Sequence, residues 1–384
     1  MKLNKNVLII NRLNKIKFIE VAYKINGNLS KTKIDSAKLD FHRVFYGWYN
    51  GLVENDFNCI FIDNISYIIP SILAQICPKI YLFLLKVQNT KKIKLNILNL
   101  IDKLVFTLHM AHLLIKNKPK YIIFPYDTLN RALITIAKIN KCKTISFFGV
   151  VPKLKTERVK NIVLCYDNII SGYNLPELWP EIKMKFQKIY IGPSYKSNYT
   201  NYPEQKKNID ITIVGGFGGD IFHKRAEIIE RLIPNLEQNN IIYKICGYKR
   251  GDDFSKRYPI LNDRLDEPIY GEKFYELIKS TNIWINIPSD QHISINATRP
   301  QGILEIAASK TFQLVYNTKE ASEMFNPQNE IILFNDPKDL FEKIVYFLEK
   351  KSEANSIALN AYNKFVTSYS GEIQILKVLR KIDE

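Results

Sequence analysis

The feature that most constrains the fold is the alternation of short, β-branched apolar runs with amphipathic helical segments between residues 209 and 350. Strands are predicted at 209–214, 241–246, 283–287, 311–315 and 330–333. Helices are predicted at 221–232, 272–280, 301–308, 321–325 and 339–350, with two more in the tail 353–382. Strands joined through helices form a parallel, doubly wound sheet.

The first half of the chain carries the same alternation. Strands are predicted at 6–11, 59–63, 121–124, 144–148 and 161–164, and helices at 44–54, within 71–116 and at 132–139. Apolar periodicity stops at 195–208 (YKSNYTNYPEQKKN), which indicates a linker. We therefore predict an α/β protein of two Rossmann-like domains, 1–200 and 201–366, followed by a helix at 367–384 that packs back toward the first domain.

The formal net charge is +17, from 55 Lys and Arg against 38 Asp and Glu. Such a balance favours anionic partners: nucleic acid, an acidic membrane surface or a phosphate-bearing substrate. The lysines are scattered without a dense basic run, so codon bias in an AT-rich genome explains the charge equally well.

Cysteine and hydropathy patterns bear on localisation. The cysteines are widely spaced, at Cys59, Cys77, Cys142, Cys165 and Cys246. This spacing predicts neither a zinc site nor a disulfide framework and favours a reducing cytoplasm. The apolar stretch 104–115 is interrupted by His109 and His112 and is shorter than the roughly 20 residues of a membrane span. Any membrane contact is expected to be peripheral.

A glycine-rich segment, 215–220 (GGFGGD), is predicted to be the loop between the first strand and first helix of the second domain. Around Gly215, Gly216 and Phe217, main-chain N–H groups and the helix N-terminus could approach a phosphate. The spacing departs from G-x-G-x-x-G, which favours a single diphosphate over a dinucleotide. A tight turn without a ligand is the alternative.

Three basic residues, His223, Lys224 and Arg225, are expected in the first turn of the following helix. Cations are unfavourable at a helix N-terminus unless an anion lies nearby, and a bound diphosphate would be such an anion. A solvated basic turn is the alternative.

The most informative segment is 286–315 (NIPSDQHISINATRPQGILEIAASKTFQLV). A polar loop leads to Arg299 and Pro300, and proline suits a helix start. We expect Glu305 in the first turn of that helix, close enough to Arg299 for both to reach one ligand. Arginine matches phosphate oxygens and glutamate can accept from ribose hydroxyls. The alternative is a salt bridge within the helix, or a cap.

From about Asp210 to the end of the chain, short motifs follow one another in a specific order. They are Gly215-Gly216, Cys246-Gly247-Tyr248, Tyr270-Gly271, Ile285-Asn286, Arg299, 302–309 (GILEIAAS), 311–315 (TFQLV), 323–325 (EMF) and 329–331 (NEI). This series resembles the C-terminal domain of group-1 glycosyltransferases of the CgeB-like (spore maturation protein) type.

The resemblance implies a GT-B fold, in which two Rossmann-like domains face a cleft, the C-terminal one binding a nucleotide-sugar and the N-terminal one the acceptor. It implies that Arg299 contacts the diphosphate and Glu305 the ribose. Lys310 stands where many relatives have glycine, and residues 302–304 replace a bulky residue before the glutamate. Together with the basic helix start, the predicted donor-binding residues are Gly215, Gly216, Phe217, Lys224, Arg225, Gly247, Tyr270, Asn286, Arg299 and Glu305.

In the first half of the chain, Asp127 follows a predicted strand, where an acceptor-side base or positioning carboxylate would lie. A cap of the next helix is the alternative, and Asp167 has the same ambiguity. His109 and His112 fit one amphipathic helix better than a metal site. We therefore predict Arg299 and Asp127 as the catalytic residues.

No D-x-D-like pair lies in a suitable loop, so we expect no metal requirement and no cofactor, with Arg299, backbone amides and Lys224 or Arg225 neutralising the diphosphate. The predicted reaction is sugar transfer to a hydroxyl of a polysaccharide, lipid-linked glycan or protein.

Three other functions remain open. A DNA-base glucosyltransferase has the same architecture, and the +17 charge would bind nucleic acid. A non-catalytic protein could use the same fold to bind a glycan or nucleotide. A Rossmann-type oxidoreductase is disfavoured by the missing G-x-G-x-x-G.

Overall fold

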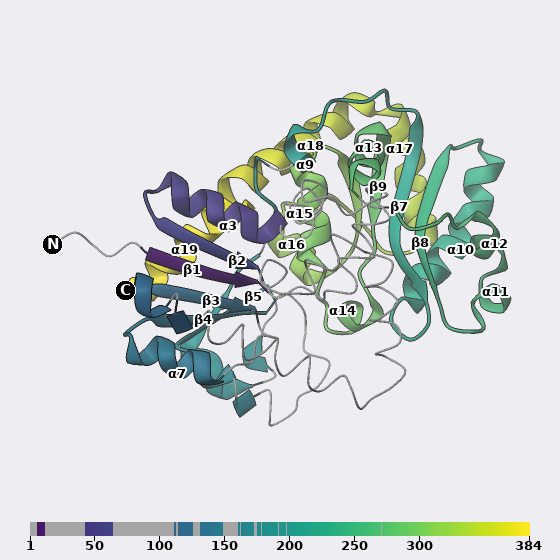
Figure 1. Ribbon diagram of the computed structural model, residues 1–384. Helices are drawn as coiled ribbons and strands as arrows, with labels where there is room; N and C mark the ends of the chain where they lie inside the picture. The colour runs from purple at the N-terminus through teal and green to yellow at the C-terminus, as the bar shows by residue number, and fades with distance from the viewer. Residues whose placement is uncertain are drawn as a thin grey trace, which may run out of the picture. The chain divides into compact units, whose positions relative to one another are not determined.

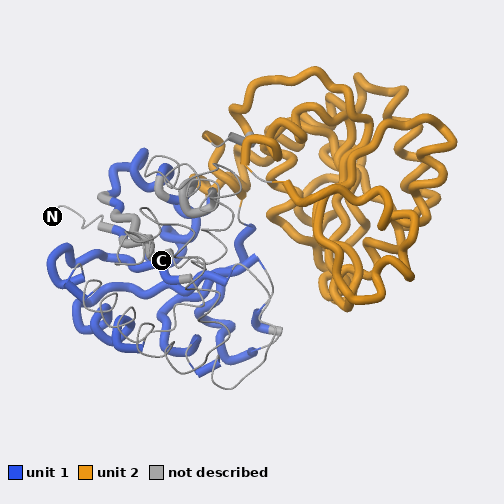
Figure 2. The backbone as a smooth tube through the Cα atoms, turned by 45° about the vertical axis from the view of Figure 1, so that its right-hand side comes forward, with its two compact units in different colours: residues 1–190, 374–384 blue, residues 191–373 orange. Residues whose placement is uncertain are grey.

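The computed structural model describes residues 6–11, 43–63, 111–112, 114–125, 131–148, 160–161, 163–172, 175–177, 179–190, 192–196, 198–269 and 271–384. The chain divides into two compact units, unit 1 (1–190 and 374–384) and unit 2 (191–373) (Figure 2). Each unit contains one parallel sheet, so the predicted α/β architecture is confirmed. The domain ranges 1–200, 201–366 and 367–384 stay predictions.

Unit 1 is built on a sheet whose strands lie in the order β2-β1-β3-β4-β5-β6, all parallel. The strands are β1 (Asn6–Asn11), β2 (Asn58–Asp63), β3 (Tyr121–Pro125), β4 (Lys143–Phe148), β5 (Asn168–Ser171) and β6 (Phe186–Lys188). Its longer described helices are α3 (Arg43–Glu54) and α7 (Arg131–Ile139), shown in Figure 1. Leu133, Ile134 and Ala137 of α7 pack on Ile122 and Phe124 of β3.

The strand predicted at 161–164 is wrong. The described residues 160, 161 and 163 are helical, and the strand is β5, which follows them in the chain. Both runs are short and apolar, and periodicity alone cannot separate a buried helical turn from a buried strand. Pairing decides: Asp167 accepts hydrogen bonds from the backbone N–H (2.8 Å) and the hydroxyl (2.7 Å) of Thr144, which sets β5 beside β4. Asp167 thus connects the amino ends of β4 and β5.

The final helix, α19 (Gly371–Asp383), ends against the amino ends of β3 and β4. The Asp383 carboxylate accepts from Lys120 Nζ (2.7 Å), Lys143 Nζ (3.1 Å) and the Tyr121 hydroxyl. Burial raises the pKa of Asp383, but the hydrogen bonds from these partners outweigh it and lower the pKa to about 2. The end of α19 is therefore fastened to the sheet of unit 1.

Unit 2 contains the sheet β11-β10-β9-β7-β8, also entirely parallel. The strands are β7 (Ile209–Gly218), β8 (Tyr243–Arg250), β9 (Thr281–Asn286), β10 (Phe312–Tyr316) and β11 (Ile332–Phe334). The principal helices are α10 (His223–Gln238), α13 (Glu272–Ser280), α15 (Pro300–Ala308), α16 (Lys319–Met324), α17 (Pro337–Glu349) and α18 (Lys351–Lys364). The core lies between the sheet and α10, α17 and α18. Strand order reverses between β7 and β9, which makes this the topological switch point.

The glycine-rich segment predicted as a loop is mostly strand. Strand β7 continues to Gly218, and its register with β8 runs on from Gly215 opposite Gly247. A Cβ on Gly247 would lie 1.7 Å from the carbonyl oxygen of Gly215, so these two glycines permit close backbone approach. Gly218 and Phe222 then exchange backbone hydrogen bonds (3.1 and 3.2 Å), and α10 begins at His223.

The variant Gly247→Ala should lose about 3 kcal/mol of stability, because the added methyl group meets a backbone oxygen that cannot move without opening the sheet. Thermal unfolding measures the loss. Gly302→Ala is the matched control: its nearest contact is Asn286 Oδ1 at 3.3 Å, and alanine favours a helix interior, so the change should stay within about 1 kcal/mol. Equal effects of the two variants would contradict the packing role of Gly247.

Candidate functional site

The carboxyl ends of β7 and β9 part at the switch point. Their paired residues end at Thr212 opposite Trp284, although β7 runs on to Gly218 and β9 to Asn286. The extension of β7 pairs only with β8, on its other side. In doubly wound sheets, ligands bind where neighbouring strands diverge in this way.

A buried arginine joins the two parting strands. Arg225 of α10 is 5% exposed, and its Nε and Nη2 donate to the carbonyl of Ile287, the former at 2.9 Å, while Nη1 donates to that of Gly216 at 2.8 Å. A Cβ on Gly215 would lie 2.4 Å from Nη1, so this glycine makes room for the guanidinium. Phe222 lies under the charge, with its ring centroid 4.7 Å from Cζ.

The electrostatic setting of Arg225 is unusual. Burial, and then the nearby charge of Arg299, lower its pKa to about 9, and Asp290 acts in the opposite direction. Its Nε, Nη1 and Nη2 donate to backbone carbonyls, so carbonyl dipoles rather than a carboxylate accept these hydrogen bonds from the guanidinium. A guanidinium in this setting projects positive potential into the switch point.

The N-terminus of α10 is capped from a distant part of the chain. Its N-cap residue, Phe222, has no side-chain acceptor, and the carboxylate of Asp290 accepts from the backbone N–H of His223 (2.8 Å) and Lys224 (2.9 Å) instead. The Asp290 N–H donates in return to Ile221 O at 2.9 Å. The anion expected beside this basic helix start is thus a side chain of the protein itself.

The loop from β9 to α15 brings an unpredicted histidine into the site. His292 lies in α14 (Asp290–Ser294), and its Nδ1 is 2.5 Å from Ser289 Oγ. Burial, and then Arg299 and Arg225, lower its pKa from 6.5 to about 4, so it is neutral near pH 7. One signal could have revealed it: a polar run, SDQH, begins at Ser289, three residues after the end of the buried strand β9.

The same loop is fixed at its far end to α16. The Thr298 N–H donates to the buried Glu320 carboxylate at 3.0 Å, and Asn296 Oδ1 accepts from the Lys319 N–H at 2.8 Å. Arg299 follows as the N-cap residue of α15, with an exposed side chain. Backbone hydrogen bonds on both sides of the loop therefore hold Arg299 in place.

Glu305 lies one turn further into its helix than predicted. Helix α15 begins at Pro300, so Glu305 lies in the second turn, is 6% exposed, and is preceded by no acidic residue in the first turn. Asn286, at the end of β9, donates to Gln313 Oε1 at 2.7 Å, and its Oδ1 would lie 3.3 Å from a Cβ on Gly302. The start of α15 and the end of β9 are thus in contact.

Apart from Asn286 and Glu305, the predicted site residues fall into three groups. Gly215, Gly216, Arg225 and Arg299 meet around the switch point. Three others have structural surroundings of their own: Phe217 is fully buried in the core, Lys224 Nζ pairs with Glu227 at 3.4 Å, and Gly247 packs on β7. Tyr270 and Asp127 lie outside the described residues.

Lys310 has a backbone conformation that glycine adopts more readily than other residues. Its φ is +56°, in the left-handed region that glycine adopts without cost, just after α15. The ammonium lies 4.5 Å from the Tyr362 ring centroid, which gives the lysine a favourable contact.

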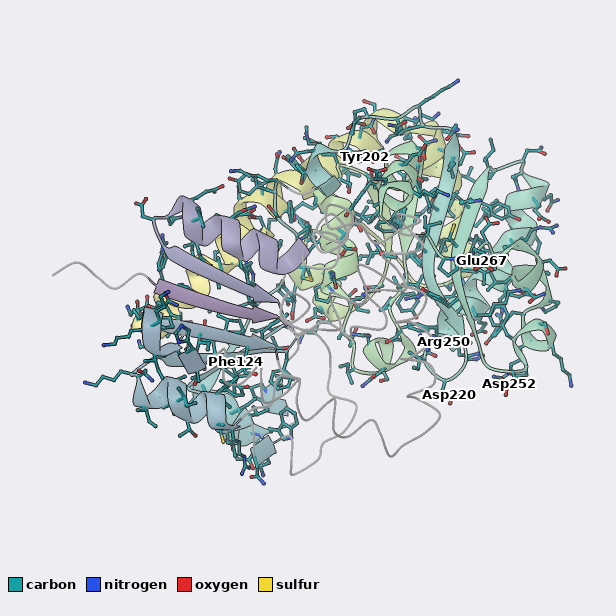
Figure 3. All side chains as sticks on the ribbon, in the orientation of Figure 1. Phe124, Tyr202, Asp220, Arg250, Asp252 and Glu267 are labelled. Atoms are coloured by element: carbon teal, nitrogen blue, oxygen red, sulfur yellow. The ribbon has the colours of Figure 1, made fainter. Side chains whose placement is uncertain are left out.

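Arg250 forms the other border of the β7–α10 turn. It is exposed at the end of β8, and its Nε would lie 3.3 Å from a Cβ on Gly216 (Figure 3). Its guanidinium also lies over Phe222, with 5.4 Å between Cζ and the ring centroid. Arg225 and Arg250 thus flank one aromatic ring at this turn.

Across the described ranges, no group of three or more His, Cys, Asp and Glu is arranged to hold a metal ion. Within the same parts of the chain, no helix combines the length and apolar character needed to cross a bilayer.

Comparisons with known proteins agree with this architecture. Residues 224–378 match the sequence model of a family described as "Glycosyl transferase-like". A search of curated proteins found no match.

The solved structures with similar folds include a glycosyltransferase from Rickettsia africae ESF-5, with a TM-score of 0.58 at 13% identity over 99% of this chain and 98% of that one. Anabaena Alr3699/HepE, in complex with UDP and glucose, has a TM-score of 0.54 at 11% identity (98% and 99%). Sucrose-phosphate synthase (tll1590) from Thermosynechococcus elongatus has 0.52 at 11% identity (99% and 98%). At these identities the likeness concerns the fold: the chain has the predicted GT-B fold, and the CgeB-like subtype stays a prediction.

The depressed pKa of His292 predicts a specific pH dependence of stability. Between pH 6.5 and about 4 the unfolded chain binds a proton that folded His292 does not, so this residue lowers stability as the pH falls, by up to about 3 kcal/mol at pH 4. His292→Gln removes the titration. The melting temperature of the variant, relative to that of the wild type, should therefore be higher at pH 4.5 than at pH 7.

His112→Gln, at an exposed position of unit 1, controls for loss of an imidazole and should not reproduce the shift. A difference between wild type and His292→Gln that stays constant with pH would contradict the burial of a neutral His292.

Proposed function

We propose that this protein is a glycosyltransferase that transfers a sugar from a nucleotide-sugar donor to an acceptor hydroxyl. The observation that carries the proposal is the pair of arginines at the switch point of unit 2, one buried and one exposed, within the segment that matches a glycosyltransferase-like family. The GT-B fold of the whole chain supports it.

The charge balance suits a diphosphate. Arg299 is exposed and can form a bidentate contact with phosphate oxygens, whereas Arg225 has its donors engaged by carbonyls and acts through its charge. The charge of Arg299 helps to lower the pKa of Arg225, and a bound anion would relieve that repulsion.

The same arrangement supplies what the reaction needs. When the acceptor hydroxyl attacks the anomeric carbon, negative charge develops on the departing nucleoside diphosphate. Fixed positive groups aimed at that charge stabilise the transition state more than the bound donor. We assign this task to Arg299 as the direct contact and to Arg225 as a source of potential behind it.

The remaining roles follow the resemblance in the sequence. We assign the ribose to Glu305, with Gly215, Gly216 and Asn286 close to the donor, and acceptor positioning to unit 1, with Asp127 as the candidate base. The acceptor class we favour is a polysaccharide, a lipid-linked glycan or a protein hydroxyl.

Arg299→Ala should weaken nucleotide-sugar binding roughly ten- to a hundredfold, the effect of one charge-assisted contact. The unliganded variant should be as stable as the wild type or more so, because a repulsion with Arg225 disappears. Calorimetric titration with UDP-, GDP-, dTDP-, ADP- and CMP-sugars measures the first effect, and thermal unfolding the second.

Arg264→Ala is the matched control, since Arg264 is half-exposed and pairs with Glu237 at 2.7 Å on the outside of the same unit. Unchanged affinity in the Arg299 variant, or a wild type that binds none of these donors, would contradict the proposal.

We also expect turnover to persist after chelation with EDTA, because arginines rather than a metal offset the diphosphate charge. Donor turnover by metal-free protein, with and without added Mg²⁺ or Mn²⁺, measures this. Activity that returns only with metal would overturn this part of the proposal.

A further inference from the structure

The N-terminus of α10 has the features of an anion-binding site, and a carboxylate of the protein occupies it. A helix of 16 residues presents free N–H groups and a positive dipole end, the usual means of binding phosphate beside the first strand of a doubly wound sheet. Here the two oxygens of Asp290 accept from the first two N–H groups of the helix, His223 and Lys224.

Asp290 is also tied to the arginine between the strands. The residue three positions before it, Ile287, provides a carbonyl for Arg225, and the Asp290 N–H bonds back to Ile221. The segment 287–290 is therefore fastened to the first turn of α10 by side-chain and backbone contacts. From this anchor the chain continues through His292 to Arg299.

The charges around this point have a definite balance. Arg225 and Arg299 are positive, Asp290 is negative, and His292 is neutral near pH 7. A phosphate that entered the α10 N-terminus would displace or adjoin a carboxylate. Like charges at such short range disfavour each other, so the carboxylate lowers the affinity of this end of the crevice for a second anion.

We propose that Asp290 is a positioning residue that closes the α10 N-terminus to phosphate and directs the diphosphate of the donor to Arg299 at the start of α15. This inference rests on the proposed function. Asp290 keeps the helix capped and the Arg225 bridge in place. At the same time, the negative charge of its carboxylate opposes the binding of a second anion. Removing only this charge should therefore lower the stability of the protein and raise its affinity for the donor.

Asp290→Asn separates these two effects. Asparagine keeps one oxygen acceptor but places its NH₂ group against one of the two backbone N–H groups that the carboxylate satisfies in the wild type. The melting temperature should therefore fall. Affinity for the nucleotide-sugar should rise by roughly three- to tenfold, because a negative charge beside the site is gone. A merely structural role predicts that stability and affinity fall together.

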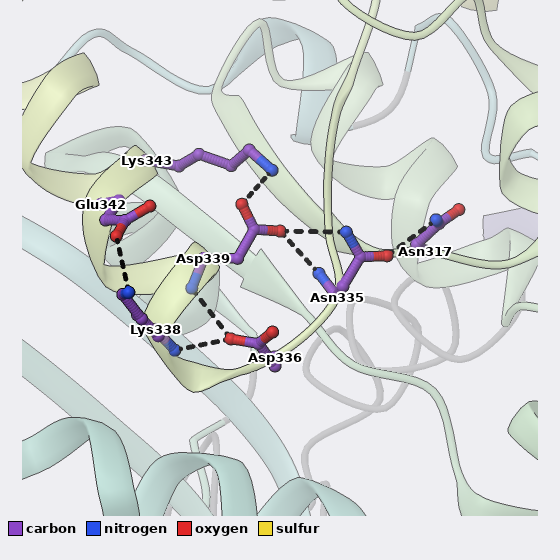
Figure 4. Close-up of polar contacts among 7 residues, drawn as sticks. All are labelled: Asn317, Asn335, Asp336, Lys338, Asp339, Glu342 and Lys343. Atoms are coloured by element: carbon purple, nitrogen blue, oxygen red, sulfur yellow. Dashed lines mark hydrogen bonds and ion pairs between the residues drawn. The ribbon is translucent and has the colours of Figure 1, made fainter.

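Asp336→Asn is the matched control. Asp336 caps α17 in the same unit, its Oδ1 accepting from Lys338 N–H (2.9 Å) and Asp339 N–H (3.0 Å) (Figure 4). Asp336 follows β11, and β11 lies three strands from β7, which separates the two strands by about 14 Å across the sheet. This distance exceeds the screening length of about 8 Å at physiological salt, so donor affinity should not change.

A second measurement uses the wild type and does not depend on how the variant folds. The chain has five histidines, so protein labelled with ¹⁵N-histidine gives a small set of amide signals that includes His223. If Asp290 keeps the cap, saturating nucleotide-sugar should leave the His223 amide shift and its exchange protection nearly unchanged.

The outcomes distinguish this inference from the proposed function. Tighter donor binding by Asp290→Asn with an unchanged His223 amide supports the inference. Equal or weaker binding by the variant, or a large donor-induced shift at His223, overturns it while leaving the glycosyltransferase proposal standing. A wild type that binds no nucleotide-sugar overturns both.

Discussion

The structure of the candidate site depends on one buried guanidinium. Where β7 and β9 diverge, Arg225 donates hydrogen bonds to the carbonyls of both Gly216 and Ile287. Leaving a buried carbonyl without a donor costs about 1–3 kcal/mol, so this bridge sets the spacing of the strand ends. The absence of a side chain at Gly215 makes room for it. The turn, the cap on α10 and the loop that carries Arg299 are all attached to these two strand ends.

Local patterns predicted most of the fold because parallel strands and their crossover helices have distinct periodicities. They failed where a decision needed a partner far away in the chain. The glycines after Val214 have the composition of a turn, yet they extend β7, because Gly247 of β8 packs against their backbone. The misplaced strand at 161–164 has the same cause, since the contact of Asp167 with Thr144 decides which apolar run joins the sheet.

In the candidate site, too, local patterns predicted some residues, whereas others depend on distant parts of the chain. Arg299 could be found from its neighbours, as an arginine before a proline at a helix start. The polar run SDQH marks the loop of Asp290 and His292, but their roles could not be predicted, because these depend on residues of α10, 67 positions from Asp290 in the case of His223. The carboxylate of Asp290 lies beside the three basic residues at the start of α10. Our proposal therefore places the phosphate contact at α15 rather than at α10.

The central claim is that the diphosphate of a nucleotide-sugar binds at Arg299, beside the α15 start, with Arg225 behind it. A crystal structure of the protein with the preferred nucleoside diphosphate tests this most directly. Phosphate oxygens are expected within about 3 Å of the Arg299 guanidinium, with Asp290 still capping α10. A diphosphate seated on the amides of His223 and Lys224, or bound away from the β7–β9 switch point, would contradict it.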